Sequence, residues 1–200
     1  MSDLRRRVSR ALVSAAGFDV TGEPPNVPVY VAVAAPHTSN WDFPAMIAMA
    51  WASGVTPVWL GKEEMFAGPL GPLMHRLGGI AVDRQNPRGL VDEVSHMVKT
   101  AERVAVVIPP EGTRGGGRYW KSGFHRIASA AGVPIVLTYL DGPSRSGGWG
   151  PAFMPSGDIT DDMNRIRAFY ADKRGLRPSR KTEPLLRSED ADAATGRQAQ

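Results

Sequence analysis

The sequence of 200 residues contains no cysteine. This absence excludes disulfides, thiolate metal sites and a cysteine nucleophile. Hydrophobic residues make up 42% and charged residues 22% of the chain, a composition that excludes a mainly disordered, collagen-like or coiled-coil protein. The charge imbalance is small, with a formal net charge of +4. A mild basic excess suits an anionic partner such as a phosphate, a nucleic acid or an acidic lipid.

The sequence also lacks a segment that we expect to cross a membrane. Residues 1–20 have no apolar core of the kind found in signal peptides. The longest stretch without a charged residue, 43–61, reaches the length of a membrane span. Residues 53–57 (SGVTP) interrupt this stretch, so it is better explained as a buried helix followed by a buried strand. A protein that lies in the cytoplasm, or on a membrane without crossing it, is therefore expected.

Short apolar runs alternate with helical patterns along most of the chain. Buried strands are predicted at 29–34, 55–60, 80–83, 104–108 and 134–140, and helices at 44–53, 62–77, 87–102, 122–131 and 161–174. This alternation predicts a single α/β domain, with a central, mixed but mostly parallel sheet flanked by helices. We expect this domain at 29–177, a basic helix and linker at 1–28, and a disordered polar tail at 178–200.

The first 17 residues predict a short basic amphipathic helix. Leu4, Val8 and Leu12 follow helical spacing, and four arginines between positions 5 and 10 lie mostly around the other side. Such a helix can pack on the domain, or it can contact the surface of an anionic bilayer. Both interpretations fit the pattern.

A histidine and an aspartate are five residues apart in the loop between the first predicted strand and the helix that follows it. A histidine such as His37 can take a proton from a hydroxyl near neutral pH. Asp42 could bind one imidazole nitrogen, fix the tautomer and stabilise the imidazolium. The spacing alone is weak, because capping and surface pairs of this kind are common.

Two further glycine-containing segments contain arginines that could bind phosphate. Residues 109–114 (PPEGTR) follow a buried strand, and Arg114 can bind phosphate through two hydrogen bonds. The segment is not a Walker loop, because the Gly-Lys-Ser/Thr ending is absent. Residues 78–84 (GGIAVDR) place Arg84 just beyond another strand, where a surface salt bridge is the alternative interpretation.

In order and type, these segments resemble the motifs of the lysophosphatidic acid acyltransferase (1-acylglycerol-3-phosphate O-acyltransferase) family of glycerolipid acyltransferases. His37 and Asp42, with Ser39 between them, match the first motif. Residues 78–84 match the second, 111–114 (EGTR) match the third without change, and 133–136 (VPIV) match the fourth. Lys62 and residues 121–124 (KSGF) also look familiar, and the resemblance extends from about residue 29 to about residue 139.

The resemblance implies an enzyme of phospholipid biosynthesis that transfers an acyl group from acyl-CoA or acyl-carrier protein to a hydroxyl of a glycerophosphate-type lipid. It implies no metal and no cofactor beyond this co-substrate. The basic N-terminal helix and the lack of a spanning segment, in contrast, predict a peripheral position on an anionic membrane. His37 would be the general base and Asp42 would orient it. Arg84 and Arg114 would bind the acceptor phosphate, and Glu111 would support the dyad or contact the acceptor hydroxyl. The other substrate contacts would be Ser39, Lys62, Gly112 and Thr113, and the helix from Phe43 to Trp51 would help form an apolar wall for the acyl chain.

Three alternatives remain open at this stage. The acceptor could be a non-phosphorylated glycolipid or another alcohol, or the chain could be a non-catalytic protein that binds a membrane surface or an acidic partner. Residues 165–181 carry seven basic residues and one acid, which is compatible with nucleic-acid binding. Only Phe169 and Tyr170 could stack on bases there, so no nucleic-acid partner is expected. His125 is interpreted as a structural histidine within a helix.

Overall fold

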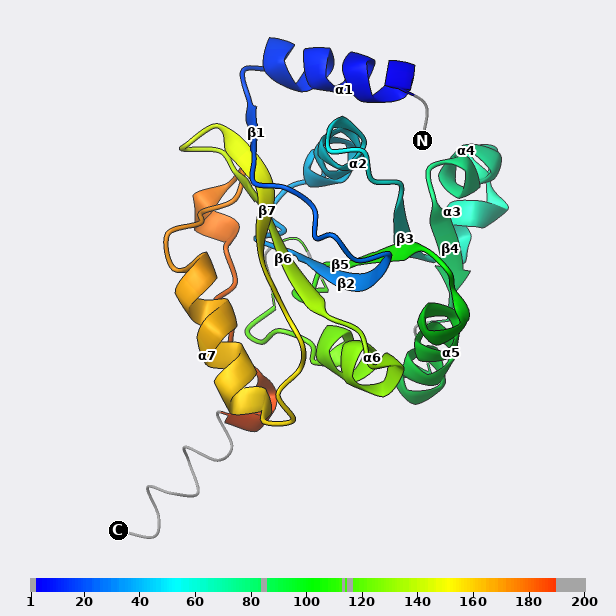
Figure 1. Cartoon of the computed structure of the whole chain (residues 1–200), viewed down its shortest axis with the longest axis vertical. Helices are drawn as coiled ribbons and strands as arrows, with labels where there is room; N and C mark the ends of the chain where they lie inside the picture. Colours follow the sequence, from blue (N-terminus) through cyan, green and yellow to red (C-terminus); the bar gives the residue numbers. More distant parts are fainter. Residues whose placement is uncertain (1–2, 84–85, 113, 115–116, 190–200) are drawn as a thin grey trace, which may run out of the picture.

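The computed structural model describes residues 3–83, 86–112, 114 and 117–189. Its centre is a seven-stranded sheet with the strand order β1-β7-β6-β2-β5-β3-β4 (Figure 1). Neighbouring strands are parallel except for the antiparallel pair of β6 and β7. The predicted α/β class and mostly parallel sheet are therefore confirmed. The strands are β1 Asp19–Thr21, β2 Val29–Ala34, β3 Pro57–Lys62, β4 Gly79–Val82, β5 Val104–Ile108, β6 Ile135–Asp141 and β7 Ser146–Phe153.

Helices cover both faces of the sheet (Figure 1). One face carries α2, with α1 as an additional layer outside it, and the other face carries α5 and α6. The α-helices are α1 Asp3–Ala15, α2 Asp42–Ala52, α3 Glu64–Ala67, α4 Gly71–Arg76, α5 Pro87–Thr100, α6 Gly123–Ala131 and α7 Ile159–Tyr170, followed by a 3-10 turn at Pro178–Arg180. Helix α1 and the last of the described residues lie at opposite ends of the molecule.

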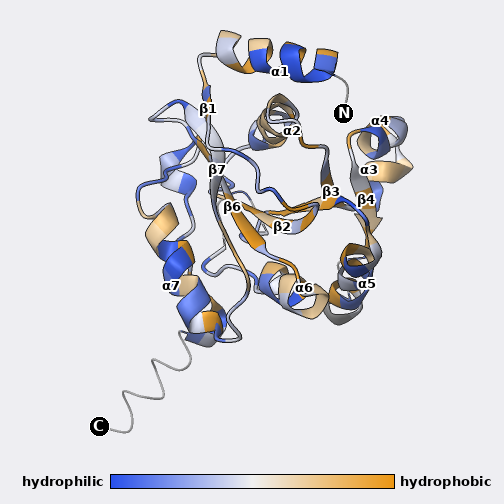
Figure 2. Ribbon diagram, in the orientation of Figure 1, coloured by the Kyte–Doolittle hydropathy of each residue, from blue (hydrophilic) through white to orange (hydrophobic). Residues whose placement is uncertain are grey.

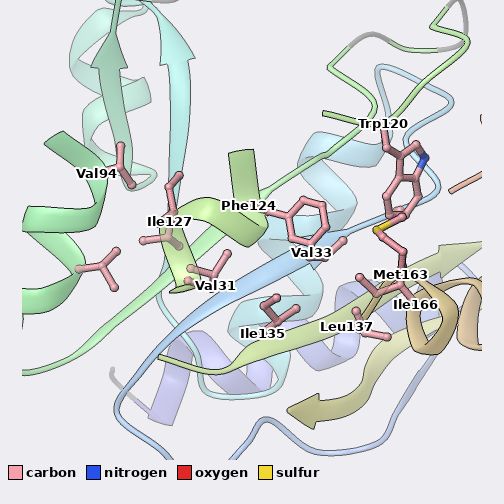
Figure 3. Close-up of a cluster of buried hydrophobic side chains, with 14 of the residues drawn as sticks. Val31, Val33, Val94, Trp120, Phe124, Ile127, Ile135, Leu137, Met163 and Ile166 are labelled. Carbon is pink, nitrogen blue, oxygen red and sulfur yellow. The ribbon is translucent and has the colours of Figure 1, made fainter. Parts of the chain in front are cut away.

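Side chains of the central strands alternate between two hydrophobic layers, because successive residues of a strand point to opposite faces. The larger layer joins β2 and β6 to α6 and α7, and Figure 3 shows Val31, Ile135, Phe124 and Ile166 within it. The smaller layer, under α2, contains Ala32 and its neighbours on β5 and β6. Burial on both faces explains the almost continuous apolar sequence of these strands, which are orange in Figure 2. The buried strands also determine the positions at which the loops that follow them leave the sheet.

Helix α1 forms where the sequence predicts a basic amphipathic helix, but its apolar stripe does not face the domain. Ser9 and Val13 are the buried residues of α1. The stripe formed by Leu4, Val8 and Leu12 has side chains that are 72%, 49% and 63% exposed. The helix therefore packs on the domain through one side and presents its hydrophobic side outward. Within the described residues, no helix is long and apolar enough to cross a membrane.

Two parts of the sheet were not predicted as strands. Neither β1, of three residues, nor the full length of β7, of eight residues, is expected from the sequence. β7 includes Gly147 and Gly148, which are poor strand formers in isolation. A side chain at Gly148 would collide with the backbone of Thr21 in β1. Close approach of the two backbones therefore outweighs local propensity here.

The segment after α7 also differs from expectation in its first part. Residues 178–189, expected to be disordered, pack on the domain. Thr182 and Leu186 are only 6% and 2% exposed. Leu186 pairs with Trp120 in an isolated parallel bridge, and the Trp120 indole N–H donates to the Thr182 carbonyl at 3.1 Å. A single buried tryptophan thus supplies contacts that the polar composition of this segment does not reveal. Residues 190–200 lie outside the described residues.

Candidate active site

The topology brings the first and third sequence motifs together. β2 and β5 are parallel neighbours, with Val33 opposite Ile108 at their carboxyl ends. The loop that carries His37 leaves β2, and the loop that carries Glu111 leaves β5, so both emerge at the same edge of the sheet. In open α/β sheets, ligands bind at the carboxyl ends of the strands.

His37 and Asp42 form the expected pair. The His37 Nδ1 atom lies 3.1 Å from Asp42 Oδ2, and the histidine side chain is 17% exposed. The same Asp42 oxygen accepts hydrogen bonds from the backbone N–H groups of Thr38 and Ser39, at 2.6 and 2.7 Å. The tight loop thus fixes the carboxylate, and the carboxylate in turn fixes the imidazole. The second Asp42 oxygen, Oδ1, is buried and has no hydrogen-bond partner among the described residues, a feature that often accompanies a functional role.

Glu111 reaches the backbone of the histidine. The His37 N–H group lies 2.9 Å from each carboxylate oxygen of Glu111, which is only 2% exposed. The pKa of Glu111 is raised to about 7, mainly by burial and to a smaller extent by the nearby charge of Asp42. The His37 hydrogen bond and the charge of Lys181 act in the opposite direction. Of the two roles that the sequence left open, this geometry favours support of the dyad.

Ser39 and Gly112 take part in the shape of the two loops. The Ser39 side chain is buried, and its hydroxyl accepts a hydrogen bond from the Trp41 N–H at 3.2 Å. Gly112 has a left-handed φ of +70°, and a Cβ atom there would lie 2.8 Å from Lys121 Cε. Glycine is therefore required where the backbone turns below Lys121.

The cationic residues predicted to contact substrate do not gather as closely around the His37–Asp42 pair. Arg114 is exposed, just after the Glu111 loop. Lys62 is exposed at the end of β3, which β5 separates from β2. Both side chains are at the carboxyl edge of the sheet, but no contact joins them to the His37–Asp42 pair. Arg84 and Thr113 lie outside the described residues.

A comparison with protein families gives one match to this arrangement. The family model described as Acyltransferase matches residues 20–140. The chain belongs to the acyltransferase family. The matched residues include His37, Asp42 and Glu111, together with the strands that position them. A search of curated proteins gives no significant match.

An apolar groove runs along α2 of this acyltransferase, and neither His37 nor Asp42 is among the residues that line it. Its first residue on α2 is Phe43, next to Asp42, and its last is Trp51 in the final turn. The groove has a volume of about 270 Å³. Side chains from α1, α2 and the end of α4 line it: Arg5, Val8, Ser9, Leu12, Phe43, Pro44, Ile47, Ala48, Trp51 and Leu77. The helix expected to form an acyl-chain wall therefore does border an elongated apolar space.

Contacts from the far end of the acyltransferase chain complete the site, and sequence reasoning missed them. The Arg177 N–H donates to the hydroxyl of Thr38, beside His37, at 3.0 Å. Lys181 is close enough to Glu111 to lower its pKa. The signal that could have indicated these residues is the basic run at 165–181, which the sequence offered only as a possible nucleic-acid surface.

Proposed function

We propose that this acyltransferase moves an acyl group from a CoA or acyl-carrier-protein thioester to a hydroxyl of a glycerophosphate-type lipid. The observation that carries the proposal is the contact of 3.1 Å between His37 Nδ1 and Asp42 Oδ2. The pair lies in a loop at the carboxyl edge of the sheet, within the residues that match the family.

His37 is the general base in the proposed reaction. Asp42 Oδ2 lies 3.1 Å from Nδ1 and favours a proton there, so the other ring nitrogen, Nε2, can accept the proton of the acceptor hydroxyl. The hydroxyl oxygen then attacks the thioester carbonyl, and the new C–O bond replaces the C–S bond when the tetrahedral intermediate collapses. The imidazolium returns its proton to the departing thiolate. Asp42 stabilises the positive imidazolium between the two transfers.

The acyl chain lies in the groove beside α2 in this proposal. Phe43 and Pro44, which follow Asp42 in the first turn of α2, border the groove, so the acyl chain would enter it near this turn. Its lining is almost entirely apolar, with Ile47 and Trp51 along its length. An alkyl chain in such a groove is stabilised by about 0.8 kcal/mol for each CH₂ group removed from water.

The acceptor phosphate is assigned to Arg114 and Arg84. Arg114 is exposed beyond the Glu111 loop, and Arg84, which is outside the described residues, follows β4 in the sequence. A guanidinium pairs with a phosphate through charge-assisted hydrogen bonds, each worth about 1.5–3 kcal/mol net.

The proposed membrane contact is made by α1 together with α4. Val8 and Leu12 border the groove from α1, and Leu77 borders it at the end of α4. On α4, Leu73 lies one turn before Leu77 and is 47% exposed, and Leu70 is 63% exposed. The apolar stripe of α1, the groove and this side of α4 therefore adjoin, and the arginines of α1 suit anionic headgroups. A lipid acceptor could then reach the dyad without leaving the surface.

The function is tested by incubating the purified protein with mixed acyl-CoAs, acyl-carrier-protein thioesters and candidate acceptors, followed by mass spectrometry of the lipids. We expect thioester cleavage that depends on an added alcohol, and a lysophospholipid or glycerophosphate that gains one acyl chain. Acylation of only a glycolipid or another alcohol would favour the non-phosphorylated acceptor. No cleavage with any acceptor would leave the non-catalytic surface-binding protein as the better explanation.

Membrane contact is tested separately by co-sedimentation with vesicles that contain acidic phospholipid. We expect binding at low salt that falls as the salt concentration rises, because exposed charges are screened. A protein with Leu4, Val8 and Leu12 changed to Ser should bind less. Absence of binding at low salt, or binding that survives a high-salt wash, contradicts the proposal.

A further inference from the structure

The segment that follows α7 returns across the carboxyl edge of the sheet. We call residues 171–189 the C-terminal strap. Trp120 anchors it, since the backbone N–H and the indole N–H of Trp120 donate to the carbonyls of Leu185 and Thr182 at 2.8 and 3.1 Å. Leu186 is buried in the large hydrophobic layer. The strap lies wholly outside residues 20–140, which match the acyltransferase family, so it is a feature of this chain beyond the matched domain.

The strap contacts the loop of the proposed general base. Thr38, the neighbour of His37, is fully buried, and its hydroxyl accepts the N–H of Arg177 at 3.0 Å. Gly175 lies against the same side chain: its φ is +73°, and a Cβ there would be 2.8 Å from Thr38 Oγ1. The Thr38 N–H donates to Asp42. A chain of contacts therefore leads from the strap through one threonine to the dyad.

A buried lysine of the strap acts electrostatically on the carboxylate behind the histidine. The Lys181 side chain is only 7% exposed, and Nζ lies 3.3 Å from the Glu183 carboxylate. Nζ also donates to the backbone carbonyl of Tyr170 at 3.1 Å, so its position is fixed. The charged and titratable groups that face Glu111 are His37 and Asp42 from the loop after β2, Tyr170 from α7 and Lys181 from the strap. Lys181 is the only fixed cation in this set.

We propose that the C-terminal strap positions the catalytic pair through its contact with Thr38, and that Lys181 of the strap favours the ionised carboxylate of Glu111 that holds the backbone of His37. Lys181 is thus a positioning residue that acts through Glu111, and the proposal rests on the proposed function of His37 as a base. An ionised carboxylate accepts a stronger hydrogen bond than a protonated one. Burial opposes this ionisation and raises the pKa of Glu111 to about 7, and Lys181 lowers the pKa. Removing the ammonium should therefore move the pKa of Glu111 upward.

The test compares Lys181→Met, which keeps the aliphatic stem, with Lys181→Arg, which keeps the charge. We expect Lys181→Met to lower kcat about 10- to 100-fold, the scale of loss when a catalytic group is slightly misplaced. The KM values for donor and acceptor should change less than about twofold. The acid limb of the kcat/KM profile should move to higher pH, and Lys181→Arg should restore both properties. Lys173→Met is the matched control, because Lys173 is also on the strap but pairs with Asp172.

A double-variant cycle assigns the pH effect to Glu111. In a Glu111→Gln background, the change of Lys181 to Met should no longer move the acid limb. The proposal is overturned if the shift persists in that background, if Lys181→Met has the wild-type kcat, or if the kcat loss occurs without a shift of the acid limb. An inactive wild-type protein, or an active His37→Ala protein, would instead contradict the proposed function.

A second pair of variants tests the strap if Lys181→Met does not fold. Thr38→Val removes the acceptor of the Arg177 N–H, whereas Thr38→Ser retains a hydroxyl. We expect a lower kcat with an unchanged KM in the first variant and recovery in the second. Equal kcat values in the two variants would contradict a positioning role of this contact.

Discussion

Among the described residues, two histidine–aspartate pairs have nearly the same contact distance and very different surroundings. His37 Nδ1 lies 3.1 Å from Asp42, and His125 Nε2 lies 2.8 Å from Asp162. The first pair spans a single loop at the carboxyl edge of the sheet. The second joins α6 to α7, and its aspartate is completely buried.

The difference lies in what the other atoms of each pair can do. In His125 the second ring nitrogen also has a neighbour, since Nδ1 lies 3.5 Å from the Ser129 hydroxyl. In His37 the second nitrogen has no partner among the described residues, and the side chain is 17% exposed. A histidine engaged through both nitrogens holds helices together, whereas one engaged through a single nitrogen can exchange a proton with a substrate. Pairing with aspartate therefore does not by itself identify a base.

The largest expected difference between the pairs is in turnover. His37→Ala should lower the rate of acyl transfer about 10²- to 10⁴-fold with the fold intact, the usual contribution of a general base. His125→Ala should leave the rate of the folded protein unchanged. It should lower the stability by about 3 kcal/mol, because a buried carboxylate loses a hydrogen bond, and lower Tm by about 6–12 °C.

These outcomes are checked by steady-state kinetics and thermal unfolding of the two purified variants. The comparison fails if the folded His125→Ala protein loses activity as severely as the His37→Ala protein. It also fails if His37→Ala retains nearly normal turnover.

A smaller expected difference concerns the arginines near each pair. Arg114→Ala should raise the acceptor KM about tenfold, which corresponds to about 1.4 kcal/mol, and change the donor KM less. Lys at this position should rescue only in part, because an ammonium cannot make the planar two-point contact. Arg126→Ala is the control, since Arg126 is also exposed but follows His125 on α6. An unchanged acceptor KM in Arg114→Ala, with only a loss of stability, would favour an unphosphorylated acceptor.

The sequence predicted one pair as a candidate base and explained the other only as a structural histidine. Local signals were enough to predict the His37–Asp42 pair, because a loop of five residues after a buried strand fixes the positions of both residues. The central strands could be predicted for a similar reason, since burial on both faces leaves a continuous apolar run.

Contacts between distant segments could not be predicted in this way. His125 and Asp162 are 37 residues apart, and Glu111 meets the His37 backbone from 74 residues away. β1 and β7 form because Gly148 lets two backbones approach, and the strap packs because of Trp120. Each of these contacts depends on the finished sheet, so composition and periodicity do not indicate them.

The pH dependence of stability separates the carboxyl groups of the two regions by its sign. Burial raises the pKa of Glu111 from 4.5 to about 7. The stability associated with its protonated form is fully present below about pH 4.5 and is lost as the pH rises through 7. Burial also acts to raise the pKa of Asp162, but hydrogen bonds from His125 and Ser156 outweigh it and lower the pKa below 3.8. Its contribution is present above this value and is lost as the pH falls through the lowered pKa.

Urea unfolding of the wild-type protein, Glu111→Gln and Asp162→Asn over a pH series measures, for each carboxyl group, the slope of the free energy of unfolding against pH. Relative to Glu111→Gln, the wild-type protein should lose up to about 3 kcal/mol as the pH rises from about 4.5 to above 7, because one pKa unit corresponds to about 1.4 kcal/mol. Relative to Asp162→Asn, the wild-type advantage should be constant near neutral pH and shrink only below about pH 4. Slopes of the same sign would contradict the distinction. Opposite slopes would mean that the acidic group behind the proposed base costs stability at neutral pH, while the one behind the structural histidine contributes to it.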